Sequence, residues 1–205
     1  MSKSKSKKQR NRGIKISAVL LAGGESRRMG KDKGTLPFRG KPLWQIQLDR
    51  LRKLKPADIF VSARTDPEWR PKDVQFVADD PPSRGPLSGL AATLARIQSS
   101  HLLALAIDMP FMNEGHLRAL CDQIHPGCGV LPMIGDRAEP LAAIYSLGAH
   151  TEFVKALSGP DFSMQTLTNR LVEMGRLRVV RVSQREQQFY RNLNDPSDLE
   201  DQRIR

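Results

Sequence analysis

The chain has 205 residues, of which 39% are hydrophobic and 27% are charged, and this balance is typical of a globular protein with an apolar core. Its length suits one sizeable domain and is too short for two. No apolar run approaches the roughly 20 residues that cross a bilayer, which argues against a membrane-spanning protein. The formal net charge of +11 favours anionic ligands, but it does not choose among phosphates, nucleotides and acidic proteins.

A short basic segment opens the chain. Residues 1–12 contain six cations and no acid, so the remaining residues carry a net charge of +5, which is +11 minus 6. A segment of this kind is usually solvated and without fixed structure. We therefore expect a basic disordered tail over residues 1–13 and a single domain over residues 14–205. The alternative is that the tail contacts nucleic acid, which predicts binding that weakens steeply with salt.

The cysteines bear on the cellular compartment. Cys121 and Cys128 are separated by six residues, and no second pair follows. This spacing matches neither a zinc site nor a disulfide framework, so both thiols are expected to be reduced. The start of the chain also has no apolar stretch of the kind found in secretory signals. Together these observations predict a cytoplasmic protein.

Apolar runs bounded by turn residues predict the secondary structure. Strands are predicted over residues 14–22, 58–62, 74–78, 101–108, 130–133, 141–145 and 178–182. Helices are predicted over residues 42–54, 88–97, 113–124, 148–157 and 163–174, with a last one beginning at Pro196. The alternation of strands and helices predicts a three-layer α/β fold with a mostly parallel central sheet. Ligands of such folds bind beyond the carboxyl ends of the strands.

The first predicted strand runs directly into a glycine-rich loop. Gly23 and Gly24 let the backbone approach a polyphosphate closely and direct N–H groups at it. The cations of this loop are Arg27, Arg28, Lys31 and Lys33. A P-loop is excluded, because five residues instead of four separate Gly24 from Gly30, and Asp32 stands where Ser or Thr is required. The remaining alternative to a phosphate site is an ordinary strand-to-helix turn.

Three other predicted strand ends carry polar residues. Asp108 ends the fourth strand, where a carboxylate can hold a Mg²⁺ ion that bridges phosphates, or can simply cap the next helix. Asp79 opens a loop that leads to Gly89, and an acid there can accept hydrogen bonds from a ribose or a purine edge, although a solvated turn is the alternative. Asn192 and Asn194 offer donors and acceptors to an acceptor molecule, but asparagine also favours turns.

Several segments resemble the molybdenum cofactor guanylyltransferases, in that family's order, from about residue 16 to residue 200. They are Leu21-Ala-Gly-Gly-x-Ser-x-Arg-Met-Gly-x-Asp-Lys33, Gly40-Lys-Pro-Leu-Trp-Gln45, Asp79 with Gly85-Pro-Leu-Ser-Gly89, Asp108-Met-Pro-Phe111, Glu139-Pro-Leu141 before Tyr145, and Asn192-Leu-Asn-x-Pro-x-Asp-Leu199. The opening motif is shared with many sugar-phosphate and cytidylyl transferases. The Arg-Met-Gly-x-Asp-Lys run and the closing Asn-x-Asn-x-Pro are more specific, and they favour the guanylyltransferases over the other transferases.

The resemblance implies a Rossmann-like nucleotidyltransferase that moves GMP from GTP to the terminal phosphate of molybdenum-bearing molybdopterin, with Mg²⁺ as cofactor and pyrophosphate as product. It implies catalytic roles for Arg28, Lys33 and Asp108, of which Asp108 holds the metal and Lys33 meets the α-phosphate region. The nucleotide-binding positions that it implies are Leu21, Ala22, Gly23, Gly24, Lys33, Arg64, Asp79 and Asp108. The positions that it implies on the acceptor side are Gly24, Gly89, Asn192 and Asn194.

One departure from the family pattern leaves alternatives open. Arg64 stands where the family often has an asparagine that contacts the nucleoside, so the choice between guanine and cytosine is not settled. Transfer of cytidylyl or another nucleotidyl group to the same or another small phosphorylated acceptor is the alternative activity. A non-catalytic nucleotide-binding regulator is a further alternative, and the presence of both Lys33 and Asp108 argues against it. We also expect a monomer or weak oligomer, cofactor-delivery or acceptor proteins as partners, and neither membrane nor nucleic acid as a partner.

Overall fold

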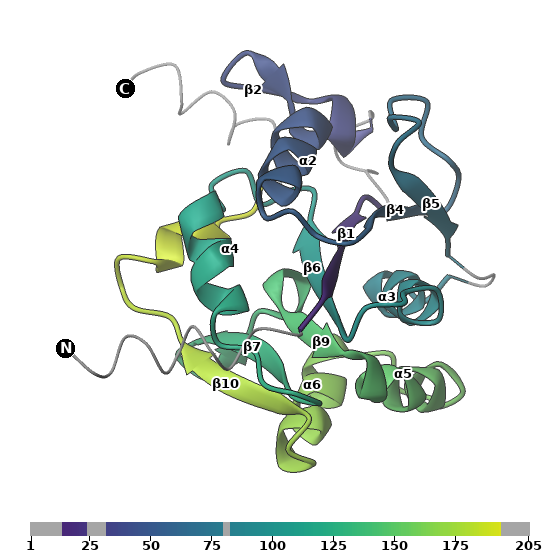
Figure 1. The fold of residues 1–205 in the computed structure, drawn as a ribbon, viewed down its shortest axis with the longest axis vertical. Helices are drawn as coiled ribbons and strands as arrows, with labels where there is room; N and C mark the ends of the chain where they lie inside the picture. The colour runs from purple at the N-terminus through teal and green to yellow at the C-terminus, as the bar shows by residue number, and fades with distance from the viewer. Residues whose placement is uncertain (1–13, 24–31, 80–82, 194–205) are drawn as a thin grey trace.

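A computed structural model describes residues 14–23, 32–79 and 83–193. An eight-stranded sheet in the order β10–β7–β9–β6–β1–β4–β5, with β8 paired to β7 outside this path, forms its centre (Figure 1). The strands are β1 (Ile16–Leu21), β2 (Pro37–Phe38), β3 (Lys41–Pro42), β4 (Ile59–Ala63), β5 (Gln75–Ala78), β6 (His101–Ala106), β7 (Gly129–Ile134), β8 (Arg137–Ala138), β9 (Ile144–Ser146) and β10 (Leu177–Arg181). The helices are α2 (Leu43–Lys53), α3 (Pro86–Leu94), α4 (Glu114–Cys121), α5 (His150–Leu157) and α6 (Met164–Glu173), with 3₁₀ turns η1 (Lys33–Thr35), η2 (Pro140–Ala142), η3 (Leu147–Ala149) and η4 (Gln187–Tyr190). The expected basic tail and the helix from Pro196 lie outside the described residues.

The direction of the strands brings their carboxyl ends together. β1 pairs in parallel with β6 on one side and with β4 on the other, and the register sets Leu21 opposite Ala106. β4 and β5 are also parallel, as are β7 and β10. β9 runs antiparallel between β6 and β7, so β7 points the same way as β6. The predicted α/β fold with a mostly parallel sheet is confirmed, and we call the side where β1, β4, β5, β6 and β7 end the carboxyl edge.

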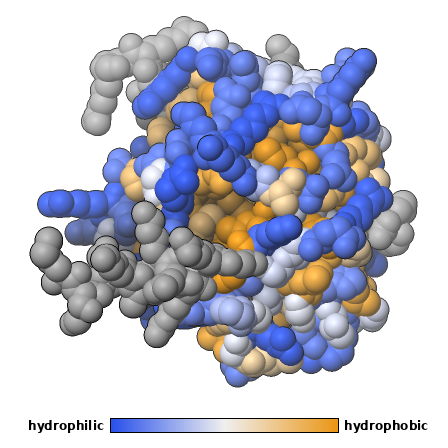
Figure 2. All heavy atoms as spheres, in the orientation of Figure 1, coloured by the Kyte–Doolittle hydropathy of each residue, from blue (hydrophilic) through white to orange (hydrophobic). Residues whose placement is uncertain are grey.

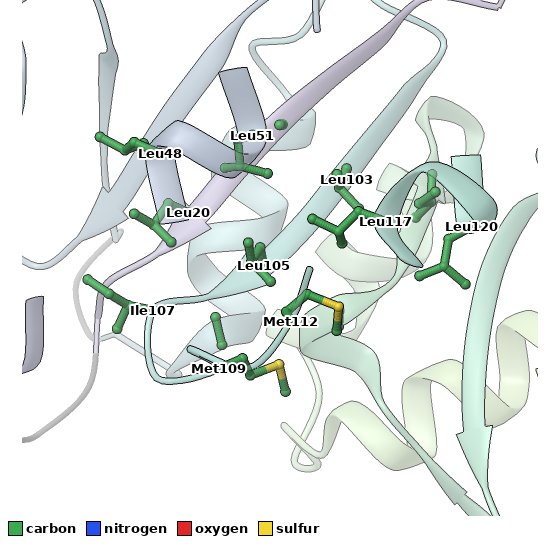
Figure 3. Close-up of a cluster of buried hydrophobic side chains, with 14 of the residues drawn as sticks. Leu20, Leu48, Leu51, Leu103, Leu105, Ile107, Met109, Met112, Leu117 and Leu120 are labelled. Atoms are coloured by element: carbon green, nitrogen blue, oxygen red, sulfur yellow. The ribbon is translucent and has the colours of Figure 1, made fainter. Parts of the chain in front are cut away.

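Alternate residues of β1 enter two separate cores, one on each face of the sheet. Ala18 and Leu20 pack on the face that carries α2 and α4, where Leu48 and Leu117 are also fully buried (Figure 3). Val19 packs on the opposite face, in the core that includes residues of α3, α5 and α6. Helices thus cover both faces, as a largely parallel sheet requires.

Local sequence signals account for several helix boundaries. The Asn113 side chain accepts a hydrogen bond from the His116 N–H (2.8 Å) and caps α4, and Ser163 caps α6 in the same way. α3 begins at Pro86, two residues before the predicted start, because proline suits the first position of a helix. None of the helices in the described residues is both long and apolar enough to cross a bilayer.

The predicted strand over residues 141–145 is partly wrong. Residues 140–142 form a 3₁₀ turn, and β9 begins only at Ile144. The Pro140 ring restricts φ and provides no N–H, while its carbonyl accepts a hydrogen bond from the Tyr145 hydroxyl (2.7 Å). The chain therefore turns before it joins the sheet. The β2–β3 hairpin was also not predicted, and its turn places Arg39 and Gly40 at φ values of 50° and 80°.

A cavity of about 540 Å³ lies at the amino ends of β1 and β6, between the last turns of α2 and α4. Its lining is mainly apolar and includes Ile16, Leu54 and Leu103, with Arg118 and Asp122 among its polar residues. Figure 2 shows hydrophobic residues in a recess of this face, surrounded by hydrophilic ones. The cavity lies at the opposite end of the strands from the carboxyl edge, so it is separate from the predicted ligand site.

The buried His101 predicts a dependence of stability on pH. Its side chain is fully buried at the start of β6, and its Nδ1 lies 3.0 Å from the Ser100 hydroxyl. Burial lowers the pKa of His101 below its ordinary value of 6.5, because the imidazolium loses its hydration. The unfolded chain therefore takes up this proton first as the pH falls. The contribution of His101 to stability is complete above about pH 6.5 and is lost below it, so we predict a lower urea midpoint at about pH 5 than at about pH 7.

A His101→Gln variant, measured by urea unfolding in the same buffers, should lose part of this pH dependence. The rest of the pH dependence should remain, because burial lowers the pKa of His116 as well. An equal fall of the midpoint in the variant and the wild-type protein would contradict the role given to His101.

Candidate active site

The centre of the candidate site is a contact between Lys33 and Asp108 at the carboxyl edge. Lys33 Nζ lies 3.0 Å from Asp108 Oδ2 and donates a hydrogen bond to it, although 75 positions separate the two residues. The side chains remain 22% and 21% exposed, so both can reach a ligand. Lys33 begins η1 after the loop that leaves β1, and Asp108 follows the adjacent strand β6. The two residues therefore lie side by side, close enough to contact the same ligand.

The returning end of the chain closes over this ion pair. The carbonyl of Leu193 accepts a second hydrogen bond from Lys33 Nζ (3.2 Å), and the Leu193 N–H donates to the carbonyl of Asp108 (2.8 Å). Asn192 is thereby held next to the pair with its side chain exposed. The predicted partner Asn194 lies outside the described residues. The sequence motif indicated the asparagines, whereas the backbone bonds of the buried Leu193 have no signature in the sequence.

Asp32 and Trp69 fasten the end of the glycine-rich loop. Asp32 accepts hydrogen bonds from the Gly34 N–H (2.8 Å) and from Trp69 Nε1 (2.6 Å). The Trp69 ring stacks on Trp44, with centroids 5.7 Å apart. A side chain on Gly34 would come within 2.9 Å of the Trp69 ring, so only glycine fits there without displacement. These contacts hold Lys33 from both sides, and the sequence analysis missed Trp69, whose only signal was a large aromatic residue in a polar loop.

Asp79 lies beneath the carboxyl edge, on the side of β1 that faces away from Asp108. It is buried, and its carboxylate accepts hydrogen bonds from the hydroxyls of Ser62 (2.9 Å) and Ser83 (3.1 Å). A side chain on Gly23 would lie 3.1 Å from this carboxylate, and one on Gly89 would overlap the Ser62 hydroxyl. A side chain at either glycine would therefore displace a polar side chain around Asp79. A carboxylate has further lone pairs, so Asp79 can still accept a hydrogen bond from a ligand.

A cavity of about 300 Å³ opens beside these residues at the ends of β1 and β4. Its walls combine apolar and aromatic groups with the backbone of the loop, and they include the exposed Arg64 and the half-buried Trp69. Its lining residues are Ala22, Gly23, Asp32, Ala63, Arg64, Thr65, Pro67 and Trp69. A cavity of this size with an aromatic wall can accommodate part of a nucleoside.

The predicted site residues fall into two groups. One group lies at the carboxyl edge or directly beneath it. Its members are Leu21, Ala22, Gly23, Lys33, Arg64, Asp79, Gly89, Asp108 and Asn192. Gly24, Arg28 and Asn194 lie outside the described residues. Gly89, expected on the acceptor side, is buried against Ser62 and Asp79.

The donors at this edge are compatible with a magnesium ion that is held together with a nucleotide. Within residues 14–23, 32–79 and 83–193, no group of three or more His, Cys, Asp or Glu side chains converges. Mg²⁺ rarely needs such a group, because it retains waters and binds one or two carboxylates together with substrate phosphates. The partly exposed carboxylate of Asp108 is a donor of this kind.

Solved structures with a similar fold indicate the fold class of this chain. Molybdopterin-guanine dinucleotide biosynthesis protein A from Archaeoglobus fulgidus matches with a TM-score of 0.71 at 23% identity, covering 90% of this chain and 95% of that one. A 4-diphosphocytidyl-2C-methyl-D-erythritol synthase from Anaerococcus prevotii also matches with a TM-score of 0.71, at 16% identity, covering 91% and 93%. The fold is that of the Rossmann-like nucleotidyltransferases.

Sequence relatives narrow the class to a family. The family model described as the MobA-like NTP transferase domain matches residues 18–174. The probable molybdenum cofactor guanylyltransferase of Opitutus terrae is 34% identical over 194 residues, which cover 92% of this chain and 95% of that protein. The molybdenum cofactor guanylyltransferase of Pseudomonas fluorescens is 38% identical over 137 residues, which cover 64% and 68%. The chain belongs to the MobA-like NTP transferase family.

The packing around Asp79 predicts that a single methyl group at Gly89 damages the site. In Gly89→Ala the new methyl would displace the Ser62 hydroxyl and loosen its bond to Asp79. We expect a loss of about 1–3 kcal/mol in the free energy of unfolding and weaker binding of a fluorescent NTP analogue. Urea unfolding and fluorescence titration measure the two effects.

Gly115→Ala is the matched control, because Gly115 also lies in the first turns of a helix but its methyl would meet only the Asn113 side chain at 3.4 Å. Alanine should be tolerated or stabilising there. Equal effects of the two substitutions would show that the packing at Gly89 has no special role.

Proposed function

We propose that this protein transfers GMP from GTP to the terminal phosphate of molybdenum-bearing molybdopterin and releases pyrophosphate. The observation that carries the proposal is the Lys33–Asp108 pair at the carboxyl edge, beside a cavity that suits a nucleoside. The names of the relatives from Opitutus terrae and Pseudomonas fluorescens support the guanylyl group and the acceptor. They do not favour the alternative of cytidylyl transfer.

The reaction requires the protein mainly to position the two substrates and to neutralise the charge of their phosphates. An oxygen of the acceptor phosphate attacks the α-phosphorus of GTP, the bond from that phosphorus to the bridging oxygen breaks, and pyrophosphate leaves. The acceptor phosphate is already ionised at neutral pH, so no protein side chain has to act as nucleophile. Lys33, held by Asp108 and the Leu193 carbonyl, is positioned to neutralise charge that develops on the α-phosphate.

Asp108 is the residue that would hold Mg²⁺, and the ion would supply positive charge to the phosphates of the nucleotide. The ammonium of Lys33, 3.0 Å from the Asp108 carboxylate, helps to hold that carboxylate in one orientation. Asp79 and the cavity beside Arg64 would receive the nucleoside. We place this activity in the cytoplasm, in a monomer or weak oligomer that receives the acceptor from a cofactor-delivery protein or passes the product to an acceptor protein.

The choice of base and acceptor is tested by pyrophosphate release with each of the four NTPs, with and without metal-loaded molybdopterin. We expect release with GTP that requires both the acceptor and Mg²⁺. Preference for CTP would support the alternative cytidylyl transfer, and release that is independent of molybdopterin would reject the proposed acceptor.

Substitutions at the pair test the catalytic assignment. Asp108→Ala should nearly abolish Mg²⁺-dependent pyrophosphate release, and Lys33→Ala should lower the rate by on the order of 10²-fold or more, because each removes one preorganised charge contact. Both variants should still unfold cooperatively in urea.

The exposed pair Lys41 and Asp49, whose charged atoms are 3.8 Å apart, provides the matched controls. Lys41→Ala and Asp49→Ala remove the same charges from the surface near α2, and we expect them to retain the wild-type rate. Wild-type turnover in Asp108→Ala would reject the metal role of that residue.

A further inference from the structure

Glu139 stands at the carboxyl edge, on the side of Asp108 away from the nucleoside cavity. In the sheet order, β6 separates β1 and β4, whose ends form that cavity, from β9 and β7. The Ala143 carbonyl accepts a hydrogen bond from the Ala104 N–H (2.9 Å). Because β9 runs antiparallel to β6, the residues just before Ala143 lie towards the end of β6 that leads to Asp108. The turn that contains Glu139 therefore borders the part of the site left for the acceptor.

The backbone around Glu139 is held rigidly. Gln165 of α6 clamps the preceding residue, donating to the Ala138 carbonyl (2.8 Å) and accepting from the Ala138 N–H (3.1 Å). The Tyr145 hydroxyl donates to the carbonyl of the following residue, Pro140 (2.7 Å). Two buried or half-buried side chains thus hold the residues on either side of Glu139.

The carboxylate itself makes no such contact. The Glu139 N–H donates to the Pro132 carbonyl (2.9 Å), but its half-buried side chain has no hydrogen bond or ion pair with any residue of the described ranges. Burial raises the pKa of Glu139, because the charge is partly dehydrated, and the positive charge of Arg137 opposes this rise only in part. A fixed backbone that presents a half-buried acid without a partner is unfavourable for stability alone, which points to a ligand that supplies the missing donors.

The segment that ends at Leu193 joins Glu139 to the reacting centre. The negative charge of Glu139 contributes, after burial, to the raised pKa of Tyr190, so the two side chains are close enough to interact electrostatically. The Tyr190 hydroxyl is already engaged with His116 Nε2 at 2.6 Å. Three residues later, Leu193 bonds to both Lys33 and Asp108. A molecule whose phosphate lies at Lys33 can therefore extend over this segment towards Glu139.

We infer that Glu139 binds the aminopyrimidinone edge of the pterin in the acceptor, and this inference rests on the proposed function. That edge carries adjacent N–H donors, on the 2-amino group and on N3, which match the two oxygens of a carboxylate. The acceptor phosphate would be repelled by Glu139, so the acid directs the pterin end away from Lys33 and the phosphate end towards it. Glu139 is thus a residue for acceptor recognition and orientation, separate from the groups at the α-phosphate.

Steady-state kinetics of the full-length protein test this role with Glu139→Gln. We expect the KM for molybdopterin to rise by on the order of 10- to 100-fold, since one charge-assisted pair of hydrogen bonds is lost, with the KM for GTP changed less than about twofold. The variant should be at least as resistant to urea as the wild-type protein, because a half-buried charge without a partner is removed.

Glu186→Gln is the matched control. Glu186 also adds negative charge near Tyr190, but its carboxylate has a partner, because Oε1 lies 3.5 Å from His116 Nδ1. This variant should keep the wild-type KM for molybdopterin. An unchanged acceptor KM in Glu139→Gln, an equal rise in Glu186→Gln, or a rise confined to the KM for GTP would each overturn the inference.

Direct binding separates this inference from the proposed function. A pterin monophosphate, followed by its own fluorescence, should bind the wild-type protein at least 10-fold more tightly than Glu139→Gln, and its N2,N2-dimethyl analogue should bind both equally weakly. Such binding without any GMP transfer to molybdopterin would reject the proposed function and leave the pterin site standing. GMP transfer with pterin binding that does not depend on Glu139 would reject the pterin site alone.

Discussion

The register between β1 and β6 is the constraint on which the site depends. It sets Leu21 opposite Ala106, so that the loop that leaves β1 and the turn that carries Asp108 begin at the same level of the sheet. A slip of one residue would move Asp108 by about 3.3 Å along the strand and would turn each side chain of that strand to the opposite face. The register is itself maintained by burial, because Val19 and Leu20 must enter cores on opposite faces. The ion pair is thus a consequence of how the apolar residues of two strands are sorted.

The two sides of the Lys33–Asp108 pair differ in how their acidic side chains are bound. On the nucleoside side, Asp79 is buried and bound by Ser62, and two glycines allow the backbone to close upon it. On the other side, Glu139 is set in a clamped turn but its carboxylate remains without a partner in the described residues. One side of Asp108 therefore has a completed network beneath its cavity, and the other presents an unfilled hydrogen-bonding group. This asymmetry is compatible with two different ligands that meet at one reacting phosphate.

The fold around the site is shared more widely than the sequence. The chain matches relatives over most of its length, whereas the similar solved structures are below 25% identity and agree in fold. Arg64, the residue that left the choice of base open in the sequence, lines the cavity beside Trp69. It follows β4, whereas Lys33 and Asp108 follow β1 and β6, so the two features occupy the ends of different strands.

The sequence by itself determined the class of fold, the order of most strands and helices, and the types of residue at the strand ends, since apolar periodicity, glycine and proline act locally. It also identified Lys33 and Asp108 as residues of one site, through a family resemblance and the rule about carboxyl ends. Only the tertiary structure decided that Trp69 holds Asp32, that Leu193 closes the ion pair, and that Pro140 delays the start of β9. These features depend on contacts between residues far apart in the chain, which carry no local signal. The same reason explains why Glu139 was visible as part of a motif, while its missing partner became apparent only when its neighbours were in place.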